Sequence, residues 1–195
     1  IDAHGLRFPL IVKPAFEGSS VGVRLSSRVA DEAALGREVA RVLEGYAQPV
    51  LVEEFCPGAE LTVGILGTGP TARAIGALQI VPRHVGPSEF VYSLEVKRDW
   101  ENQVAYEFPP KLPAPLVRRV EEVALTAHRA LGCRDVSRVD IRLDADGEPQ
   151  FIEVNPLPGL NPRTGDLCIL AAKAGLPYSR LVGSIVDGAR RRCSV

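Results

Sequence analysis

The sequence predicts an α+β fold, and three patterns support that prediction. Short apolar segments rich in Ile and Val are bounded by Gly, Pro and Asp, which is typical of β-strands. Turn sequences such as Asp144-Ala-Asp-Gly147 join consecutive strand segments directly, which favours antiparallel hairpins. Longer segments have apolar residues at helical spacing. Strands and helices do not alternate regularly and no GxGxxG motif occurs, so a Rossmann dinucleotide domain is disfavoured.

The individual elements follow from local sequence. Strands are predicted at residues 8–13, 21–25, 50–55, 60–66, 72–80, 138–143 and 150–154. Helices are predicted at residues 31–44, 115–131, 167–174 and 179–192, with Gly45 just past the first helix and Ser179 as the N-cap of the last. Residues 82–112 show little periodicity and are predicted to form a loop, and a loop this long is usually functional or mobile.

Composition excludes several classes of protein. The chain has 195 residues, 46% of them hydrophobic and 24% charged, which is ordinary for a globular protein and unlike a disordered chain. No apolar run approaches the roughly 20 residues of a membrane helix. With 23 basic and 24 acidic residues there is no basic field for nucleic acid. We therefore expect neither a nucleic-acid nor a membrane partner. Because the chain contains no Met, we expect it to be a fragment of a longer protein.

Four cysteines, Cys56, Cys133, Cys168 and Cys193, share no close spacing. They match neither a zinc site nor a redox CxxC pair, so we interpret them as free thiols in a reducing, cytoplasmic environment.

A lysine and a glycine-rich segment suggest a phosphate site. Lys13 lies at the end of an apolar strand, where a lysine is costly to bury without an anion. The segment Glu17-Gly-Ser-Ser-Val-Gly22 follows, and its backbone N–H groups and hydroxyls can surround phosphate oxygens. The lysine precedes the loop, so this is not a P-loop. An edge lysine beside an ordinary turn explains these residues equally well.

Four polar residues suggest a metal site. Strand alternation places Arg138 and Asp140 on one face of a strand, and Glu153 and Asn155 on one face of its hairpin partner. Carboxylate and amide oxygens are hard ligands suited to Mg²⁺. Two neighbouring carboxylates repel each other, so a divalent cation or Arg138 is needed between them. A solvated polar face is the alternative, but the rigid Pro156-Leu-Pro-Gly159 loop favours a metal site.

Taken together, these segments resemble the ATP-grasp superfamily and, within it, the D-alanine–D-alanine ligases. The matching segments are collinear: LIVKPAFEGSSVG at residues 10–22, Val52-Glu-Glu-Phe55 with Glu60-Leu-Thr-Val63, Arg138-Val-Asp140, and FIEVNPLPG at residues 151–159. The resemblance implies two α+β subdomains with mainly antiparallel sheets that sandwich the nucleotide. Residues 1–55 would form a small lid subdomain, incomplete at its N-terminus, and residues 56–195 a large subdomain that carries the metal site. The N-terminal domain of the family is then absent from this chain.

The resemblance also implies roles for single residues. Lys13 would contact the α- and β-phosphates, Glu60 the ribose, and Lys97 the γ-phosphate. Arg138 would stabilise the γ-phosphate and the tetrahedral intermediate, and the Gly159 amide would donate to the oxyanion. The nucleotide-binding set is Lys13, Glu17, Gly18, Ser19, Ser20, Val21, Glu53, Glu54, Phe55, Cys56, Glu60, Lys97 and Ile152. The catalytic set is Ser20, Lys97, Arg138 and Gly159; the metal ligands are Asp140, Glu153 and Asn155; the substrate set is Tyr92, Arg98, Gly159, Thr164 and Gly165.

The implied reaction is peptide-bond formation in cell-wall precursor synthesis. ATP phosphorylates a carboxylate to an acylphosphate, an amine attacks, and phosphate leaves, with two Mg²⁺ ions, or Mn²⁺ in their place, neutralising charge. The implied partners are ATP and small amino acids, and a homodimer of the full-length protein is compatible with the resemblance.

Three departures from the family lie near the substrate. Arg98 replaces the Tyr that usually follows the mobile-loop lysine, and it either binds substrate or pairs with Asp99 or Glu101. The family's Ser-Leu clamp is replaced within Arg163-Thr-Gly-Asp-Leu167, and Pro-Leu-Pro-Gly replaces Thr-Ser-Pro-Gly. A ligase for a different amino-acid or carboxylate pair is therefore the alternative prediction. A degenerate nucleotide-binding domain is the non-enzyme alternative, and the intact lysine, arginine and metal-ligand set argues against it.

Overall fold

A computed structural model describes residues 5–193, and this part of the chain divides into two compact units. The first comprises the chain up to Pro57 together with Pro82–Ala105, and the second comprises Gly58–Val81 together with the chain from Tyr106 onward. The boundary expected after residue 55 stays a prediction about the subdomains of the family.

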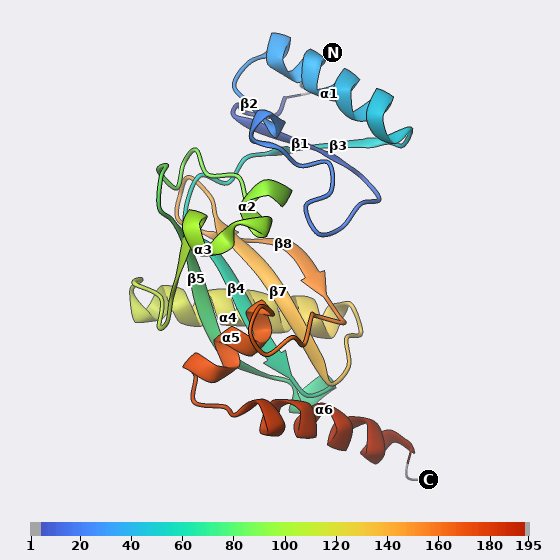
Figure 1. The fold of residues 1–195 in the computed structure, drawn as a ribbon, viewed down its shortest axis with the longest axis vertical. Helices are drawn as coiled ribbons and strands as arrows, with labels where there is room; N and C mark the ends of the chain where they lie inside the picture. The colour runs from blue at the N-terminus through green and yellow to red at the C-terminus, as the bar shows by residue number, and fades with distance from the viewer. Residues whose placement is uncertain (1–4, 194–195) are drawn as a thin grey trace. The chain divides into compact units, whose positions relative to one another are not determined.

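The first unit is built on a three-stranded antiparallel sheet in the order β2-β1-β3. Its elements are β1 (Leu10–Pro14), β2 (Arg28–Val29), α1 (Glu32–Tyr46) and β3 (Val50–Glu54). Helix α1 covers one face of this sheet (Figure 1). Leu10 and Val12 alternate along β1 and are fully buried against Leu35 and Val42 of α1. Ile11 and Lys13, which alternate with them along β1, therefore belong to the face that α1 does not cover.

Helix α1 begins where the sequence predicts and ends later. Asp31 caps its N-terminus by accepting a hydrogen bond from the Ala34 backbone N–H at 2.8 Å. Gly45 lies inside the helix, and Ala47, with φ 50°, provides the left-handed C-cap instead.

The strand expected at residues 21–25 is not formed. Ser19, Ser20 and Gly22 all have positive φ, so the segment turns back on itself. The strand that pairs with β1 is the two-residue β2, which follows a short 3₁₀ turn at Leu25–Ser27.

The region expected to be one long loop contains regular structure. Helices α2 (Leu94–Arg98) and α3 (Trp100–Gln103) follow one another, and strand β6 (Val104–Glu107) comes next. Ser93 caps α2, accepting a hydrogen bond from the Val96 N–H at 3.4 Å. These elements are too short to produce a readable periodicity, which explains why the sequence did not predict them.

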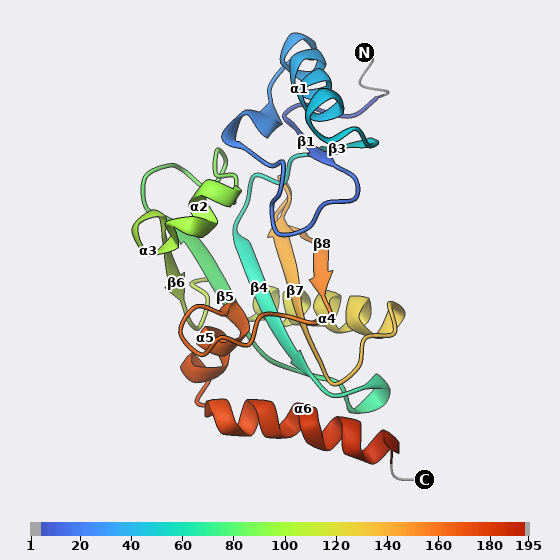
Figure 2. The ribbon, with the colours of Figure 1, turned by 45° about the vertical axis from the view of Figure 1, so that its right-hand side comes forward.

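The second unit is built on a five-stranded sheet in the order β6-β5-β4-β7-β8. The further strands are β4 (Glu60–Leu66), β5 (Arg73–Pro82), β7 (Val136–Leu143) and β8 (Pro149–Asn155), and β4 pairs antiparallel with both β5 and β7. Helix α4 (Ala114–Ala130) crosses one face of the sheet, and α5 (Asp166–Lys173) lies on the other face (Figures 1 and 2).

The core of this unit determines which side chains remain for chemistry. Leu61 and Val63 of β4 and Val139 and Ile141 of β7 are fully buried in one cluster with Val120 of α4. Because strand residues alternate between faces, the residues between them on β4 and β7 belong to the opposite face of the sheet.

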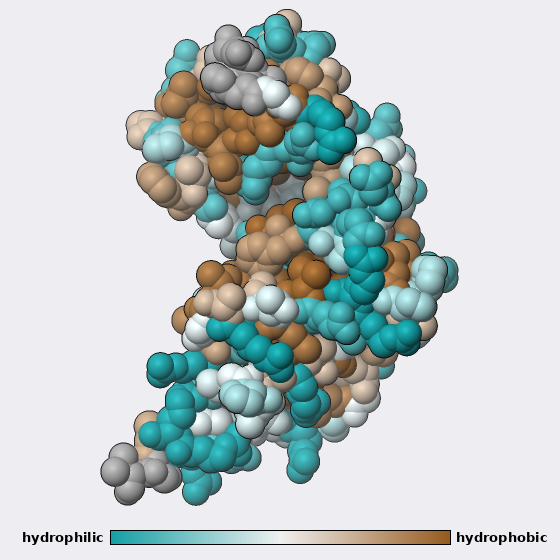
Figure 3. Space-filling view, turned by 180° about the vertical axis from the view of Figure 1, so that it is seen from behind, coloured by the Kyte–Doolittle hydropathy of each residue, from teal (hydrophilic) through white to brown (hydrophobic). Residues whose placement is uncertain are grey.

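The last helix, α6 (Tyr178–Cys193), begins one residue before the expected N-cap at Ser179. The Pro177 carbonyl accepts hydrogen bonds from the N–H groups of Arg180 and Leu181 in its first turn. The end of α6 is hydrophilic (Figure 3), in agreement with the exposed residues Arg190–Arg192. In residues 5–193, no helix combines the length and the apolar character needed to span a membrane.

Candidate functional site

Arg138 and Asp140 form a close ion pair on the sheet face opposite α4. Arg138 donates from Nε to Asp140 Oδ1 at 3.0 Å and from Nη2 to Asp140 Oδ2 at 2.8 Å. Thr62 on β4 also donates to Asp140 Oδ1, at 2.7 Å, because the strand register pairs Thr62 with Asp140. Burial alone would lower the pKa of Arg138, but the neighbouring carboxylates of Asp140, Asp166 and Glu153 raise it above its ordinary value. Arg138 is therefore a permanent cation at this position.

Glu153 and Asn155 join the same group from β8. The β7–β8 register pairs Asp140 with Glu153 and Arg138 with Asn155. Asn155 Nδ2 donates to Glu153 Oε1 at 3.2 Å and to Asp140 Oδ2 at 3.5 Å, and Arg138 Nη2 lies 3.9 Å from Glu153 Oε1. The structure thus brings together the four residues that the sequence placed on one face of a hairpin, with the guanidinium between the two carboxylates. Their roles in metal binding stay predictions.

A β-bulge lies next to this cluster. Asp140 pairs with Glu153, but Ile141 pairs with Phe151, which leaves Ile152 as the extra residue on β8. Ile152, predicted to contact the nucleotide, is 38% exposed. The bulge also places Phe151 beside the residues of α4, whereas Glu153 lies with Asp140 on the other face.

The donor set fits a divalent cation. Two carboxylates and one amide oxygen are hard ligands, and rotating the Asn155 amide by half a turn would direct its Oδ1 toward the two acids. No group of three or more His, Cys, Asp or Glu side chains in residues 5–193 is placed to hold a metal ion. That result is consistent with a set of two acids and one amide, because the guanidinium of Arg138 lies between Asp140 and the third nearby acid, Asp166.

The loop after β8 brings two predicted substrate residues together. Asn161 Oδ1 accepts from the N–H groups of Arg163 and Thr164 at 2.9 and 3.2 Å, which folds the loop tightly. A Cβ on Gly165 would overlap the Gly159 carbonyl oxygen, so the two glycines are in close contact. Thr164 itself is exposed.

Two residues that the sequence analysis left without a role contact this cluster. Asp166, the first residue of α5, accepts from Arg138 Nη1 on Oδ2 at 3.1 Å and from the Tyr106 hydroxyl on Oδ1 at 2.6 Å. These residues are far apart in sequence, and no local motif links them. The sequence offers one indication that Asp166 has a role. It lies just before a predicted apolar helix and next to the predicted substrate clamp.

Glu60, predicted to bind the ribose, is also in the second unit. Its Oε2 lies 3.6 Å from Arg142 Nη1, and both side chains are largely buried.

In the first unit, Lys13 and Glu53 lie on the uncovered face of the sheet. Lys13 Nζ is 2.5 Å from Glu53 Oε2. Glu54 follows Glu53 on β3 and accepts from Arg7 Nη2 at 3.0 Å. The hydrogen bonds from Arg7 lower the pKa of Glu54 below its ordinary value. The two glutamates, both in the predicted nucleotide-binding set, thus have different partners.

Phe55 and Cys56 follow Glu54 and complete this part of the predicted nucleotide-binding set. Phe55 is only 8% exposed, and the Arg28 guanidinium lies over its ring at 5.3 Å. Cys56 is partly buried and forms no disulfide.

The predicted phosphate loop contacts the predicted mobile segment. Ser20 Oγ donates to the Tyr92 carbonyl at 2.8 Å, and Lys97 Nζ lies 5.1 Å from the centre of the Tyr92 ring. The loop also contains a turn in which the Val21 N–H donates to the Gly18 carbonyl at 3.0 Å. Glu17, at the start of the loop, accepts from Gln48 Nε2 at 2.9 Å. The structure therefore groups three predicted catalytic or substrate residues within the first unit.

Asp99, one of the two acids expected to pair with Arg98, has other partners. The Asp99 oxygens accept from Asn102 Nδ2 at 2.6 Å and from Gln103 Nε2 at 2.9 Å. Arg98 is exposed at the end of α2. The pKa of Glu95 is lowered by hydrogen bonds to its own backbone and to Ser93, and the charge of Arg98 makes a smaller contribution.

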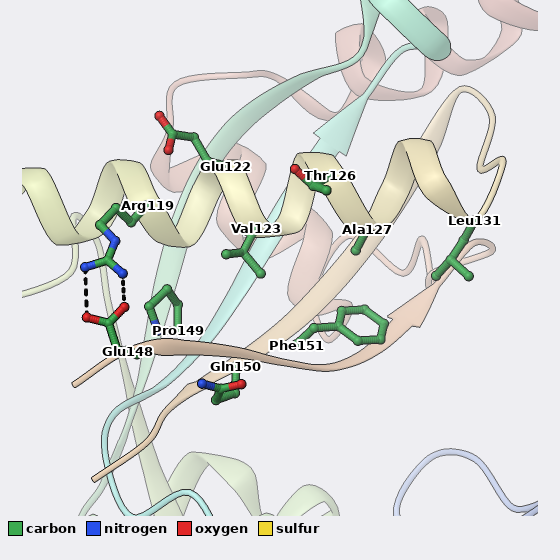
Figure 4. A pocket seen from close by; sticks show the side chains of 10 residues that line it. All are labelled: Arg119, Glu122, Val123, Thr126, Ala127, Leu131, Glu148, Pro149, Gln150 and Phe151. Atoms are coloured by element: carbon green, nitrogen blue, oxygen red, sulfur yellow. Dashed lines mark hydrogen bonds and ion pairs between the residues drawn. The ribbon is translucent and has the colours of Figure 1, made fainter. Parts of the chain in front are cut away.

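A pocket of about 600 Å³ lies between α4 and β8 (Figure 4). It is lined by Arg119, Glu122, Val123, Thr126, Ala127, Leu131, Glu148, Pro149, Gln150 and Phe151. Val123, Ala127 and Phe151 point into it, and an ion pair between Arg119 and Glu148 closes one end. None of the predicted site residues lines this pocket.

The chain matches a protein-family model described as D-ala D-ala ligase C-terminus over residues 3–187. It is 39% identical over 189 residues to the D-alanine–D-alanine ligase of Anaeromyxobacter dehalogenans, covering 97% of this chain and 56% of that protein. It is 36% identical over 189 residues to the uncharacterized protein y4sG of Sinorhizobium fredii, covering 96% of this chain and 54% of that protein. The chain thus spans about half the length of the curated relatives that it matches.

Solved structures give the same result. The crystal structure of the Bacillus anthracis D-alanine–D-alanine ligase complexed with ATP is 30% identical, with a TM-score of 0.69, over 95% of this chain and 53% of that one. The Coxiella burnetii ligase, 21% identical with a TM-score of 0.73 over 95% of this chain and 46% of that one, shows the fold alone. These similarities confirm the α+β ATP-grasp fold that the sequence predicted.

Proposed function

The chain belongs to the family of D-alanine–D-alanine ligase C-terminal domains, and on that basis we propose that the protein containing it is an ATP-dependent ligase that forms a peptide bond. The observation that carries the proposal is the convergence of Arg138 with Asp140, Glu153 and Asn155 on one face of the β7–β8 hairpin. A permanent cation beside an oxygen-ligand set that would hold a divalent cation suits phosphoryl transfer, because such a reaction depends mainly on charge neutralisation and positioning.

The proposed reaction has two steps. The carboxylate of a first amino acid attacks the γ-phosphorus of ATP, ADP leaves, and an acylphosphate forms. The neutral amine of a second amino acid then attacks the acyl carbon, and inorganic phosphate leaves with the electrons of the C–O bond and takes up the proton that the nitrogen loses. Arg138 offsets the negative charge on the phosphoryl oxygens and on the tetrahedral intermediate, and the Gly159 N–H donates to the oxyanion.

Metal and nucleotide residues are assigned in the same way. Asp140, Glu153 and Asn155 hold Mg²⁺, or Mn²⁺ in its place, and the metal supplies neutralisation of the phosphate charge. Lys13 and the loop at residues 17–21 bind the phosphates, and Lys97 reaches the γ-phosphate. The remaining nucleotide contacts are Glu53, Glu54, Phe55 and Cys56 for adenine, Glu60 for ribose, and Ile152.

Two D-alanine molecules are the proposed substrates, with Tyr92, Arg98, Gly159, Thr164 and Gly165 at the substrate end. A ligase for a different pair is the second candidate, and Arg98 favours it, because an exposed cation replaces a neutral Tyr. We place the reaction in the cytoplasm, in cell-wall precursor synthesis, and expect a homodimer of the full-length protein, which sedimentation equilibrium would measure.

An isotope experiment tests the chemistry directly. The full-length protein is given ATP, Mg²⁺ and an amino acid whose carboxylate is labelled with ¹⁸O, together with a second amino acid, across a panel of D- and L-forms. Through an acylphosphate, one labelled oxygen is transferred to inorganic phosphate for each dipeptide formed, which mass spectrometry detects. Label in AMP would indicate an acyl-adenylate, and unlabelled phosphate without dipeptide would indicate simple ATP hydrolysis.

Two variants complete this test. Arg138→Met should reduce label transfer at least a hundredfold, whereas Arg118→Met, which removes an exposed cation on α4, should leave it unchanged. If no amino acid or other carboxylate stimulates phosphate release but ATP still binds, a degenerate nucleotide-binding domain would replace the ligase as the proposed function.

A further inference from the structure

Asp166 contacts the proposed catalytic arginine from a separate element. It is the first residue of α5, and its Oδ2 accepts from Arg138 Nη1 at 3.1 Å. Its other oxygen accepts from the Tyr106 hydroxyl at 2.6 Å. Arg138 and Asp166 are both largely buried, with side-chain exposures of 15% and 17%. Both oxygens of Asp166 are thus engaged, and the carboxylate is held in one orientation.

Arg138 needs this second partner because its first partner has another role. Its Nε and Nη2 both donate to Asp140, and the Asp140 oxygens are those proposed to hold the metal. A carboxylate that turns toward a divalent cation gives up much of its interaction with a guanidinium. A largely buried guanidinium without a compensating carboxylate is strongly unfavourable, so Arg138 would compete with the metal for Asp140.

Asp166 is placed to resolve that competition. It lies on α5 and not on the β7–β8 hairpin, and it contacts Nη1, the one terminal nitrogen that Asp140 does not use. Its pairing with Arg138 therefore does not depend on what Asp140 binds.

We propose that Asp166, oriented by Tyr106, is a positioning residue that retains Arg138 beside the metal ligands when Asp140 turns to the divalent cation. This inference rests on the proposed function, since it assumes that Asp140 binds a metal. It assigns a role to two residues outside the motifs by which the family was recognised in the sequence.

The inference predicts how metal affinity responds to substitution. In Asp166→Asn, the carboxylates left to Arg138 are Asp140 and Glu153, both proposed to hold the metal, so Arg138 competes with the metal more strongly. The dissociation constant for Mn²⁺, measured by electron paramagnetic resonance on the full-length protein with a non-hydrolysable ATP analogue, should rise about tenfold. Raising Mg²⁺ should restore most of kcat. Tyr106→Phe keeps the charge and removes only the orienting hydroxyl, so it should shift the constant in the same direction by less.

A double-mutant cycle separates positioning from the simple loss of a negative charge. If Asp166 acts through Arg138, Asp166→Asn should have no further effect on the Mn²⁺ dissociation constant in an Arg138→Met background. An equal effect in both backgrounds would show that Asp166 acts as a remote charge and would overturn the inference. Asp187→Asn, which removes an exposed acid on α6, is the matched control and should match the wild type.

The outcomes remain separable from those of the proposed function. Wild-type protein that binds no Mn²⁺–nucleotide would overturn the proposed function and this inference together. Wild-type binding with an unchanged dissociation constant in Asp166→Asn would overturn this inference alone. Thermal unfolding of each variant establishes folding, and Tyr106→Phe serves as the decisive variant if Asp166→Asn does not fold.

Discussion

Lys13 Nζ lies 2.5 Å from Glu53 Oε2, so two residues assigned to nucleotide binding are joined across neighbouring strands. The register pairs Lys13 with Leu51 and Ile11 with Glu53, which makes Lys13 and Glu53 diagonal neighbours on the face that α1 leaves uncovered. The Glu53 side chain is 45% exposed, so the pair contributes little to stability. Lys13 can exchange this carboxylate for a phosphate group at a small energetic cost.

Lys13→Met should therefore affect the nucleotide and not the fold. We expect KM for ATP to rise at least tenfold, because a lost charged hydrogen bond is worth about 1.5–3 kcal/mol. The unfolding midpoint should change little. Steady-state kinetics with ATP varied measure the effect, and Arg37→Met, an exposed cation on α1, is the control. An unchanged KM for ATP in Lys13→Met would remove Lys13 from the nucleotide site.

Strand alternation was the most informative sequence signal for the site. It placed Arg138 and Asp140 on one face of their strand and Glu153 and Asn155 on one face of the neighbouring strand. The hairpin register makes these the same face of the sheet. Alternation works here because β7 has a buried face that determines its orientation, and the β7–β8 register then orients β8. At Ile152 a bulge shifts the register by one residue, and no residue type in that segment indicates a bulge.

Contacts between residues that are far apart in the sequence could not be predicted from it. Tyr106 and Asp166 are 60 residues apart in sequence, and both belong to the second unit, whose fold brings them together. The strand predicted at residues 21–25 is absent for a similar reason. Ser19 and Ser20 adopt positive φ values that their residue type does not favour. Such local conformations are set by surrounding structure, here including the hydrogen bond from Ser20 to Tyr92.

Gly22 should be required for the shape of the proposed phosphate loop. Its φ is 81°, and a Cβ there would overlap the ring of Pro14. Gly22→Ala should lower the free energy of unfolding by about 1–3 kcal/mol, because it combines left-handed strain with a steric clash. Urea unfolding measures this. Gly18→Ala, in the same loop, meets open space and should change stability by less than about 0.5 kcal/mol, so equal losses in both variants would argue against this explanation.

His128 should make the stability of the protein depend on pH. It is fully buried, with Nδ1 2.7 Å from Ser137 Oγ and Nε2 3.2 Å from the Gly67 carbonyl oxygen. Burial lowers the pKa of His128 below its ordinary value, and the hydrogen bond to the Gly67 carbonyl offsets only part of that effect.

The sign follows from proton binding. Below the ordinary histidine pKa of about 6.5, the unfolded chain binds a proton that folded His128 does not, so acid favours unfolding. This contribution to stability is fully present above about pH 7 and falls as pH decreases toward the lowered folded pKa, with a slope of at most about 1.4 kcal/mol per pH unit. Urea unfolding between pH 5 and 7.5 measures the slope. His128→Gln should reduce it, whereas the exposed His84→Gln should not; equal slopes in all three proteins would contradict the assignment.

Arg98 should determine affinity for the second amino acid. It lies at the exposed end of α2, directly after Lys97, and Asp99 is already engaged by Asn102 and Gln103. Its guanidinium is therefore available to a substrate carboxylate, which it can bind through two parallel hydrogen bonds. Arg98→Ala in the full-length protein should raise KM for the second amino acid about tenfold and leave KM for ATP unchanged. Arg98→Lys should recover only part of that loss, because an ammonium cannot reproduce the planar fork. Unchanged kinetics for both substrates would make Arg98 a surface residue and would remove the main reason for considering substrates other than D-alanine.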